Sequence, residues 1–159
     1  VKEGLALADL AKRGVLLALV DRIDAEAGVA EMLPRVFSEP DPRVSLDLYV
    51  GLTRQFHERC GDIIGTLFAA VGAEPDLTEF VAEGRGRHRG GARRMAAYLA
   101  ELGGLRDDVS KRDAAAMLTF ATGRESWVEM TEHFDYGWDE AQAVLVERLA
   151  KSLLRPEQR

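Results

Sequence analysis

The chain of 159 residues has little cysteine, few histidines and no long hydrophobic run. Its one cysteine, Cys60, excludes an internal disulfide framework and fits a reducing compartment. The longest uninterrupted apolar run, Val15–Val20, is far shorter than a membrane span. No basic segment followed by an apolar stretch and a small-residue cleavage site opens the sequence. We therefore expect a cytoplasmic protein with no secretion signal and no membrane association.

The motifs of common enzyme classes are also missing. The sequence has no Gly-x-Ser-x-Gly elbow, no phosphate-binding loop and no dinucleotide fingerprint after a strand. Of the three histidines, only His57 has a cysteine, Cys60, within one helical turn. One such pair is weak evidence for metal, and a packed, buried Cys60 is the favoured interpretation. We expect no enzyme, metal or cofactor; the alternative is a helical-bundle enzyme or metal protein.

Positive charge is not in excess. The chain has 21 Lys and Arg against 27 Asp and Glu, a net charge of −6, so its bulk surface is not expected to bind nucleic acid. The one basic run has three arginines on one helical face, Arg85, Arg89 and Arg93. The run continues with Arg87, His88 and Arg94. It is either an anion site, a contact to a DNA-binding segment or, as we favour, a solvated face balanced by nearby glutamates.

Helical periodicity is present almost everywhere, and neither hairpin turns nor strand-like alternation occurs. With 47% hydrophobic residues, the chain has enough apolar material for one core. Glycines, and caps such as Asp41-Pro42, mark the expected helix boundaries. The expected helical segments are Val15–Ala27, Val29–Ser38 (short or irregular), Pro42–Val71, Asp76–Leu102, Val109–Phe134 and Trp138–Leu154.

The last two expected helices are apolar on more than one face. Along Val109–Phe134, one stripe contains Ala114 and Leu118, and a second contains Met117, Phe120 and Trp127. One stripe is enough for a helix to join its own core, so the second predicts contact with another copy of the chain. We also expect a kink at Thr122-Gly123, because glycine in a helix costs about 1 kcal/mol relative to alanine.

This region resembles the C-terminal part of TetR/AcrR-type transcriptional regulators. The matching elements are Gly104-Leu105-Arg106, Val109-Ser110, Ala114-Ala115-Ala116-Met117-Leu118, Thr122-Gly123-Arg124-Glu125-Ser126-Trp127, Gly137-Trp138-Asp139-Glu140-Ala141 and Leu149-Ala150-Lys151-Ser152-Leu153-Leu154. The similarity runs from about Val15 to Leu154 and rests on the order and spacing of these short elements. It implies an all-α, TetR-type C-terminal bundle of about seven helices, with a homodimer formed through a four-helix bundle.

The resemblance divides the chain into residues 1–13 and residues 14–159. The first part is similar to the beginning of a helix-turn-helix DNA-binding domain. The turn and the recognition helix expected between Arg13 and Gly14 are missing. Either the N-terminus is shortened or, as we favour, two segments that flank a missing stretch are joined. An ordinary amphipathic helix is a third interpretation. Residues 14–159 correspond to the ligand-binding and dimerisation domain.

The implied function is that of a ligand-responsive transcriptional regulator, and we predict a repressor. Its operator binding would be relieved by a small hydrophobic or amphipathic effector in the helical core. A ligand-free dimerisation or adaptor domain is a further alternative. The predicted ligand-binding residues are Phe56, Cys60, Met95, Tyr98, Phe120, Arg124 and Trp127. The predicted dimer-interface residues are Met117, Val128, Trp138, Leu145, Leu149 and Leu153.

Within the ligand set, three residues are expected to orient the effector. Arg124 lies on an apolar stripe, where an unpaired charge is expensive. Tyr98 and Trp127 each carry a donor that needs a partner when buried. For Phe120, simple core packing is the favoured interpretation.

Overall fold

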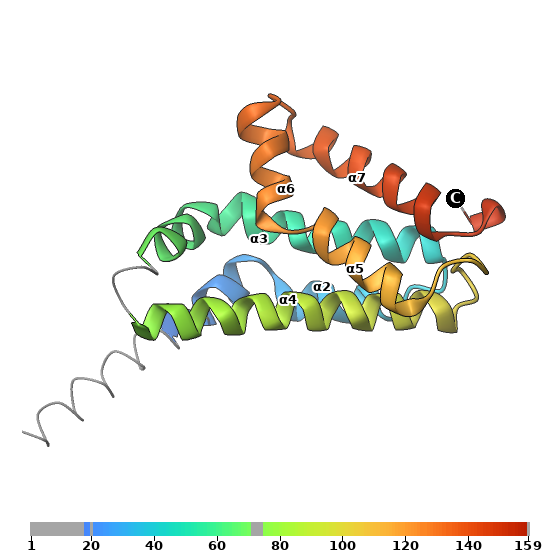
Figure 1. The fold of residues 1–159 in the computed structure, drawn as a ribbon, viewed down its shortest axis with the longest axis horizontal. Coiled ribbons are helices and arrows are strands. Elements are labelled where there is room, and N and C mark those ends of the chain that lie inside the picture. The colour runs from blue at the N-terminus through green and yellow to red at the C-terminus, as the bar shows by residue number, and fades with distance from the viewer. Residues whose placement is uncertain (1–17, 20, 71–74, 159) are drawn as a thin grey trace, which may run out of the picture.

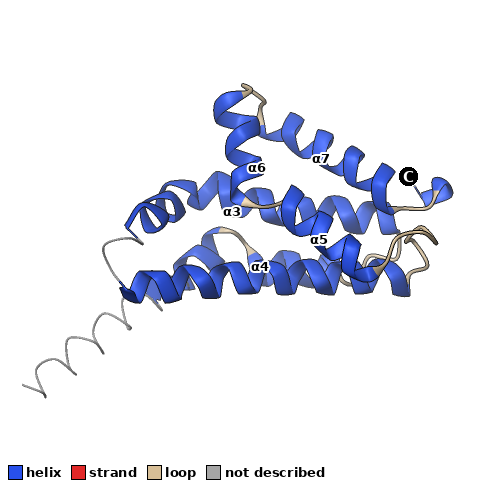
Figure 2. Ribbon diagram, in the orientation of Figure 1, coloured by secondary structure: helices blue, strands red, loops and turns tan. Residues whose placement is uncertain are grey.

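The computed structural model describes residues 18–19, 21–70 and 75–158 (Figure 1, Figure 2). All regular elements in these ranges are helical and none is a strand, which confirms the predicted all-α class with about seven helices. Residues 21–26 are helical, and the prediction for residues 1–13 lies outside the described part. The named elements are α2 (Val29–Val36), α3 (Pro42–Ala70), α4 (Pro75–Glu101), α5 (Lys111–Ala121), α6 (Arg124–Val128), the π-helical turn η1 (Glu129–His133), α7 (Trp138–Leu153) and the short η2 (Pro156–Gln158).

Two of the predicted helix starts have the expected caps. Oδ1 of Asp41 accepts hydrogen bonds from the backbone N–H groups of Arg43, at 2.8 Å, and Val44, at 3.1 Å. The hydroxyl of Ser110 accepts one from the backbone N–H of Asp113, at 3.0 Å. Each cap satisfies N–H groups that have no partner within their own helix.

Glycine ends α4 and permits tight packing of the loop that follows. Gly103 has φ 67°, a left-handed conformation in which a side chain is disfavoured. A Cβ atom at Gly104 would lie 2.6 Å from Cβ of Pro42, so only glycine fits against the start of α3. The loop is tied to the end of α7, since the N–H of Arg106 donates to the Leu153 carbonyl at 2.9 Å.

α3 is the central helix of the bundle (Figure 1). α2 and α4 pack on one side of it, α7 on the other, and α5 bridges α4 and α7. The core lies where α3, α4, α5 and α7 meet. Its largest fully buried aliphatic side chains are Val36, Leu46, Val50, Met95, Leu99, Leu118, Leu153 and Leu154. Within the described residues, no helix is both long and apolar enough to cross a membrane.

The predicted kink at Thr122-Gly123 is present and divides the penultimate helix. α5 ends at Ala121, and Gly123 is extended, with φ −71° and ψ 160°, before α6 begins. The side chain of Ser126 closes the break by donating to the Phe120 carbonyl at 2.7 Å. α6 consequently leaves the direction of α5 and rises steeply across α3 (Figure 1). This change of direction sends Trp127 into the interior.

Candidate functional site

Thr122, at the end of α5, is the centre of a polar cluster inside the bundle. Its side chain is fully buried, and its hydroxyl donates a hydrogen bond of 2.8 Å to the Leu118 carbonyl. Nε2 of His88, on α4, lies 3.0 Å from the same hydroxyl oxygen. When the Thr122 hydroxyl donates to the Leu118 carbonyl, its oxygen accepts from the tautomer of His88 that carries the proton on Nε2. One hydroxyl thus links the α5–α6 break to α4.

Two more polar side chains of the cluster come from α3. Burial lowers the pKa of His57 to about 4, with smaller contributions from His88 and Arg124. Burial also raises the pKa of Tyr49 to about 12. Both side chains are therefore uncharged near neutral pH. The Tyr49 hydroxyl lies 3.7 Å from the position of a Cβ at Gly91, an ordinary packing distance, so Tyr49 packs directly against α4.

Trp127 completes the cluster and carries its one unsatisfied donor. The side chain is fully buried between His57 and Trp138, whose ring centroids lie 6.5 Å and 5.8 Å away. Its Nε1 is the one buried side-chain nitrogen or oxygen of the described residues without a hydrogen-bond partner. A buried N–H without an acceptor costs about 1–3 kcal/mol. Such groups are rare in folded proteins and point to a site that gains a partner in another state.

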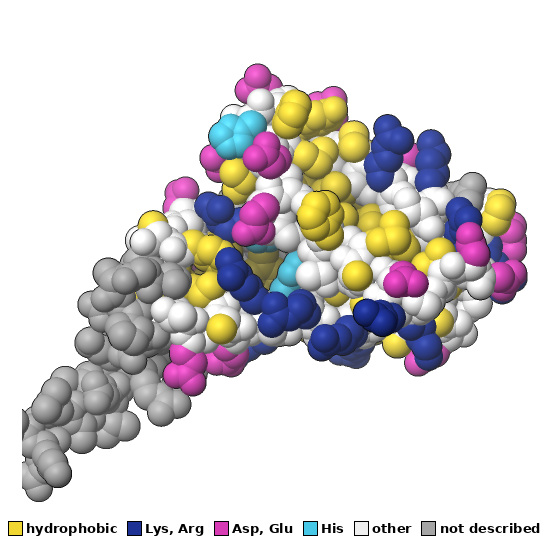
Figure 3. Space-filling view, viewed as in Figure 1, with side chains coloured by type: hydrophobic (Ala, Val, Ile, Leu, Met, Phe, Trp, Pro, Cys, Tyr) yellow, Lys and Arg dark blue, Asp and Glu magenta, His cyan; other side chains and the backbone are white. Residues whose placement is uncertain are grey.

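A hollow opens on the surface near this cluster. Figure 3 shows it between α4 and α6, with several cationic and some acidic side chains around it and histidine atoms inside. Arg85 of α4 and Arg124 of α6 both lie over the ring of Phe68 on α3, at 4.9 Å and 5.7 Å from its centroid. Nη2 of Arg124 lies 3.2 Å from the position of a Cβ at Gly65. The hollow therefore combines a cationic mouth with neutral polar groups deeper inside.

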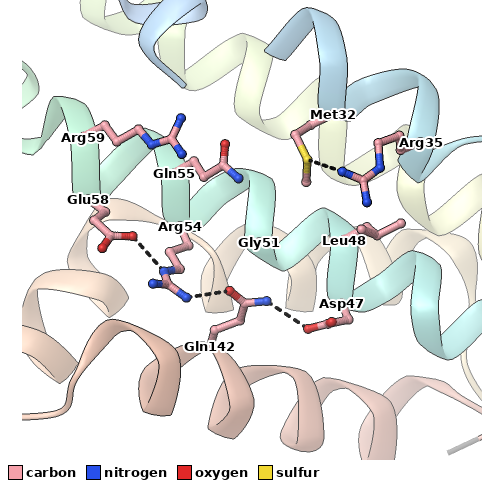
Figure 4. A pocket seen from close by; sticks show the side chains of 10 residues that line it. All are labelled: Met32, Arg35, Asp47, Leu48, Gly51, Arg54, Gln55, Glu58, Arg59 and Gln142. Carbon is pink, nitrogen blue, oxygen red and sulfur yellow. Dashed lines mark hydrogen bonds and ion pairs between the residues drawn. The ribbon is translucent and has the colours of Figure 1, made fainter. Parts of the chain in front are cut away.

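A second cleft, of about 350 Å³, lies between α2, α3 and α7 (Figure 4). In it, Arg54 bonds to Glu58 and Gln142, and Nε2 of Gln142 donates to Asp47 at 2.9 Å. Arg54 also pairs with Asp139 at the start of α7. These polar groups satisfy one another and join α3 to α7. The cleft is therefore a weaker candidate for a ligand than the hollow.

Of the seven residues predicted to bind a ligand, Arg124 and Trp127 lie at the hollow and the polar cluster. Cys60 lies elsewhere on α3: it is fully buried, and its Sγ is 3.8 Å from the Ile23 carbonyl. Met95 is also fully buried, with its sulfur 4.0 Å from the Ser45 hydroxyl. Because Cys60 and Met95 pack within the core, we leave them out of the site proposed below.

The three remaining predicted ligand residues are aromatic and lie in different surroundings. Tyr98 donates to the Glu39 carbonyl at 2.9 Å and packs edge-on against Phe37, at 5.5 Å between centroids. Phe56 is half-buried in α3. Phe120 is 84% exposed, because the break after Ala121 turns α6 inward and leaves the Phe120 side of α5 in solvent. Core packing, the favoured interpretation of Phe120, is therefore wrong. Ligand contact at Phe120 stays a prediction.

The residues predicted for a dimer interface also divide into two groups. Leu149 and Leu153 are 3% and 0% exposed within the single chain, so they have almost no surface to offer a partner. Met117 is 38% exposed. Val128, Trp138 and Leu145 are half-buried. We therefore leave Leu149 and Leu153 out of the interface proposed below.

Sequence reasoning missed most of the cluster and the wall of the hollow. His57 and His88 are far apart in sequence, and their convergence depends on how α4 packs against α3. One signal was present in the sequence. The spacing of four residues places them on one face of a helix: His57, Gly61, Gly65 and Phe68. Two glycines on one helix face are typical of a close approach, as Arg124 makes at Gly65, or of an opening, as at Gly61.

Among the described residues, no group of three or more His, Cys, Asp or Glu side chains is placed to hold a metal ion. No family model matches the chain, and no curated protein or solved structure matches it either. The resemblance to TetR/AcrR-type regulators therefore stays a prediction from the sequence.

Proposed function

We propose that this chain is the effector-binding and dimerisation part of a ligand-responsive transcriptional regulator, and specifically of a repressor. The observation that carries the effector site is the unpartnered Nε1 of Trp127, fully buried next to the α5–α6 break and close to the hollow. A ligand acceptor that reached this N–H would recover the free energy that the empty state loses. The regulatory class comes from the sequence resemblance, which also predicts the all-α bundle.

The helices that frame the hollow also contact the segment that leads to the N-terminus. Nη1 of Arg59, on α3, donates to the Glu26 carbonyl at 3.0 Å. Nη1 of Arg87, on α4, lies 4.0 Å from the Asp24 carboxylate. A change in the separation of α3 and α4 would therefore move residues 21–26. In the proposed function, this movement changes the distance between the two DNA-binding domains of the dimer. The coupling free energy between effector binding and operator binding is typically about 1–3 kcal/mol.

The proposed dimer uses the apolar surface over α5, η1 and α7. Met117 and Phe120 are 38% and 84% exposed on α5, and Phe134, after η1, is 69% exposed. Figure 3 shows hydrophobic side chains gathered over α5, α6 and α7 on this face. Single exposed apolar residues are ordinary, but a contiguous patch marks an interface. A second copy brings the same patch, as an isologous twofold interface requires.

Sedimentation velocity of the full-length protein at micromolar concentration tests the dimer. We expect a dimer for the unchanged protein and a monomer for the double variant Met117→Ser, Phe120→Ser. The matched control is Ala116→Ser, an exposed change on the same helix that alters little apolar area. A monomeric unchanged protein would contradict the proposal.

Selection of genomic DNA fragments by the full-length protein tests the regulatory part. We expect enrichment of fragments with two half-sites, and release of those fragments by a compound that raises the melting temperature of the protein. A chain that melts higher with a compound but enriches no DNA would be a ligand-binding adaptor. A chain that does neither would contradict both parts of the proposal.

A further inference from the structure

The mouth of the hollow holds two guanidinium groups over one aromatic ring. Arg85 and Arg124 approach Phe68 from different helices, at 4.9 Å and 5.7 Å. Neither arginine forms an ion pair with a carboxylate of the described residues. Two unpaired guanidinium groups held at one aromatic ring repel each other, and an anion that contacts both reduces the repulsion. A carboxylate suits this position because it accepts charge-assisted hydrogen bonds from both.

Beyond the mouth, the face of α3 carries no side chain at Gly61, whereas at Gly65 the guanidinium of Arg124 lies against the helix. Gly61 and Gly65 lie on the same face as His57 and Phe68. A Cβ atom at Gly61 would meet no atom within 4 Å, so space remains beside this part of the helix. With a rise of ~1.5 Å per residue, the wall from His57 to Gly65 is about 12 Å long. An apolar chain or ring system of that length fits along it.

The inner end offers a neutral donor and no buried carboxylate. Trp127 Nε1 is covered by packed atoms in this conformation, and the His57 ring lies next to the indole, at 6.5 Å between centroids. Among the described residues, the buried polar side chains are Ser45, Thr53 and Thr122, none of them acidic. A cationic group would therefore find no buried counter-charge at this end, since the Glu125 carboxylate that acts on His88 is exposed to solvent. An uncharged oxygen that displaces the neighbouring side chain would accept from Nε1.

From these three features we propose that the hollow binds an amphipathic carboxylate with an uncharged oxygen at the far end of an apolar body. Its carboxylate contacts Arg85 and Arg124 near Gly65, its apolar body passes Gly61, and its distal oxygen accepts from Trp127. The inference rests on the proposed effector site and adds the chemical class of the effector. Opening the covered inner end also gives the effector a different affinity for two conformations, which a switch requires.

Calorimetric titration of the full-length protein tests the ligand class with four probes of one length, all below their micelle concentrations. These are 10-hydroxydecanoate, decanoate, 1,10-decanediol and decyltrimethylammonium. We expect affinity to decrease in that order, with no binding of the cation. Loss of the carboxylate contact in 1,10-decanediol should weaken binding about 10- to 100-fold, as for a charge-assisted hydrogen bond.

Variants assign each end of the probe to its partner. Arg85→Gln and Arg124→Gln should each weaken the binding of both carboxylate probes about tenfold or more. Arg93→Gln, further along the same face of α4, is the control and should change nothing. Trp127→Phe should abolish the preference for 10-hydroxydecanoate over decanoate while leaving decanoate binding in place. Gly61→Leu should block all probes, whereas Gly84→Leu, also at a helix position with open space beside it, should not.

Equal binding of the cation and the carboxylates, or unchanged carboxylate affinity in both arginine variants, would overturn the proposed class. If the four probes fail but another compound raises the melting temperature in a way that Gly61→Leu abolishes, the class is wrong and the effector site stands. If no compound of any charge does so, the effector site itself is wrong. The two failures are thus distinguishable.

Discussion

The two ends of the bundle differ in how completely their polar groups are satisfied. At the closed end, Leu46, Leu99 and Leu153 are fully buried, and the buried Ser45 hydroxyl donates to the Val36 carbonyl at 2.8 Å. At the other end, the polar cluster around Thr122 brings two histidines and an unpartnered indole N–H into the interior. The closed end therefore stabilises the fold, whereas the end that contains the Thr122 cluster is less stable than a fully apolar or fully hydrogen-bonded core would be. Proteins retain such a loss where function requires it.

The largest expected effect is at the closed end. Leu99→Ala should lower the free energy of unfolding by about 2–5 kcal/mol, because it leaves a cavity at a fully buried position. Urea denaturation measures the change. Ala116→Ser, at an exposed position on α5, is the control and should stay within about 0.5 kcal/mol. A loss under 1 kcal/mol for Leu99→Ala would mean that this end is not the stable part.

The next effect is a pH dependence that originates at the polar end. The pKa of His57 is lowered from 6.5 to about 4 in the folded chain, so the unfolded chain binds more protons between these values. The contribution of uncharged His57 to the free energy of unfolding is therefore fully present above pH 6.5. It is lost as the pH falls toward 4, by up to about 3 kcal/mol. Urea midpoints at pH 7.5 and pH 4.5 measure the loss.

The matched variants for this pH dependence are His57→Asn and His133→Asn. His57→Asn should remove most of the loss, with a smaller part remaining because burial also lowers the pKa of His88. His133 is exposed at the end of η1, so His133→Asn should leave the pH dependence unchanged. Equal slopes in all three proteins would show that His57 titrates as in the unfolded chain.

A smaller effect is expected at the Ser110 cap, which lies at the closed end. Ser110→Ala removes the acceptor for the Asp113 N–H and should cost about 1 kcal/mol. Ser110→Thr retains a hydroxyl and should recover most of the loss. Thermal unfolding followed by circular dichroism measures both. Equal melting temperatures for the alanine and threonine variants would contradict the role of the cap.

The smallest effect on stability is expected for Trp127→Phe. The change removes an unpartnered donor that costs about 1–3 kcal/mol and also removes part of a buried ring, so the two effects should nearly cancel. We expect a net change below about 1 kcal/mol, against 3–5 kcal/mol for Trp127→Ala. A loss above 2 kcal/mol for the phenylalanine variant would show that Nε1 has an acceptor in solution.

Much of the helical architecture could be predicted from local signals. Asp41-Pro42 and Ser110 marked helix starts, and Gly103 marked an end, because caps and left-handed glycines act through their immediate neighbours. Gly123 marked the kink for the same reason. The candidate site was predicted only in part: Arg124 and Trp127 were chosen because a charge and a donor on an apolar stripe each need a partner.

The sequence by itself determined the helices, their ends and the break between α5 and α6, since each depends on residues a few positions apart. Tertiary structure alone decided that His57 and His88 meet near Thr122, that Phe120 faces solvent and that Leu149 and Leu153 are buried within one chain. The physical reason is the geometry of helix packing. A stripe of apolar side chains predicts that one face of a helix will be buried. The angles at which neighbouring helices cross it determine which residues cover that face.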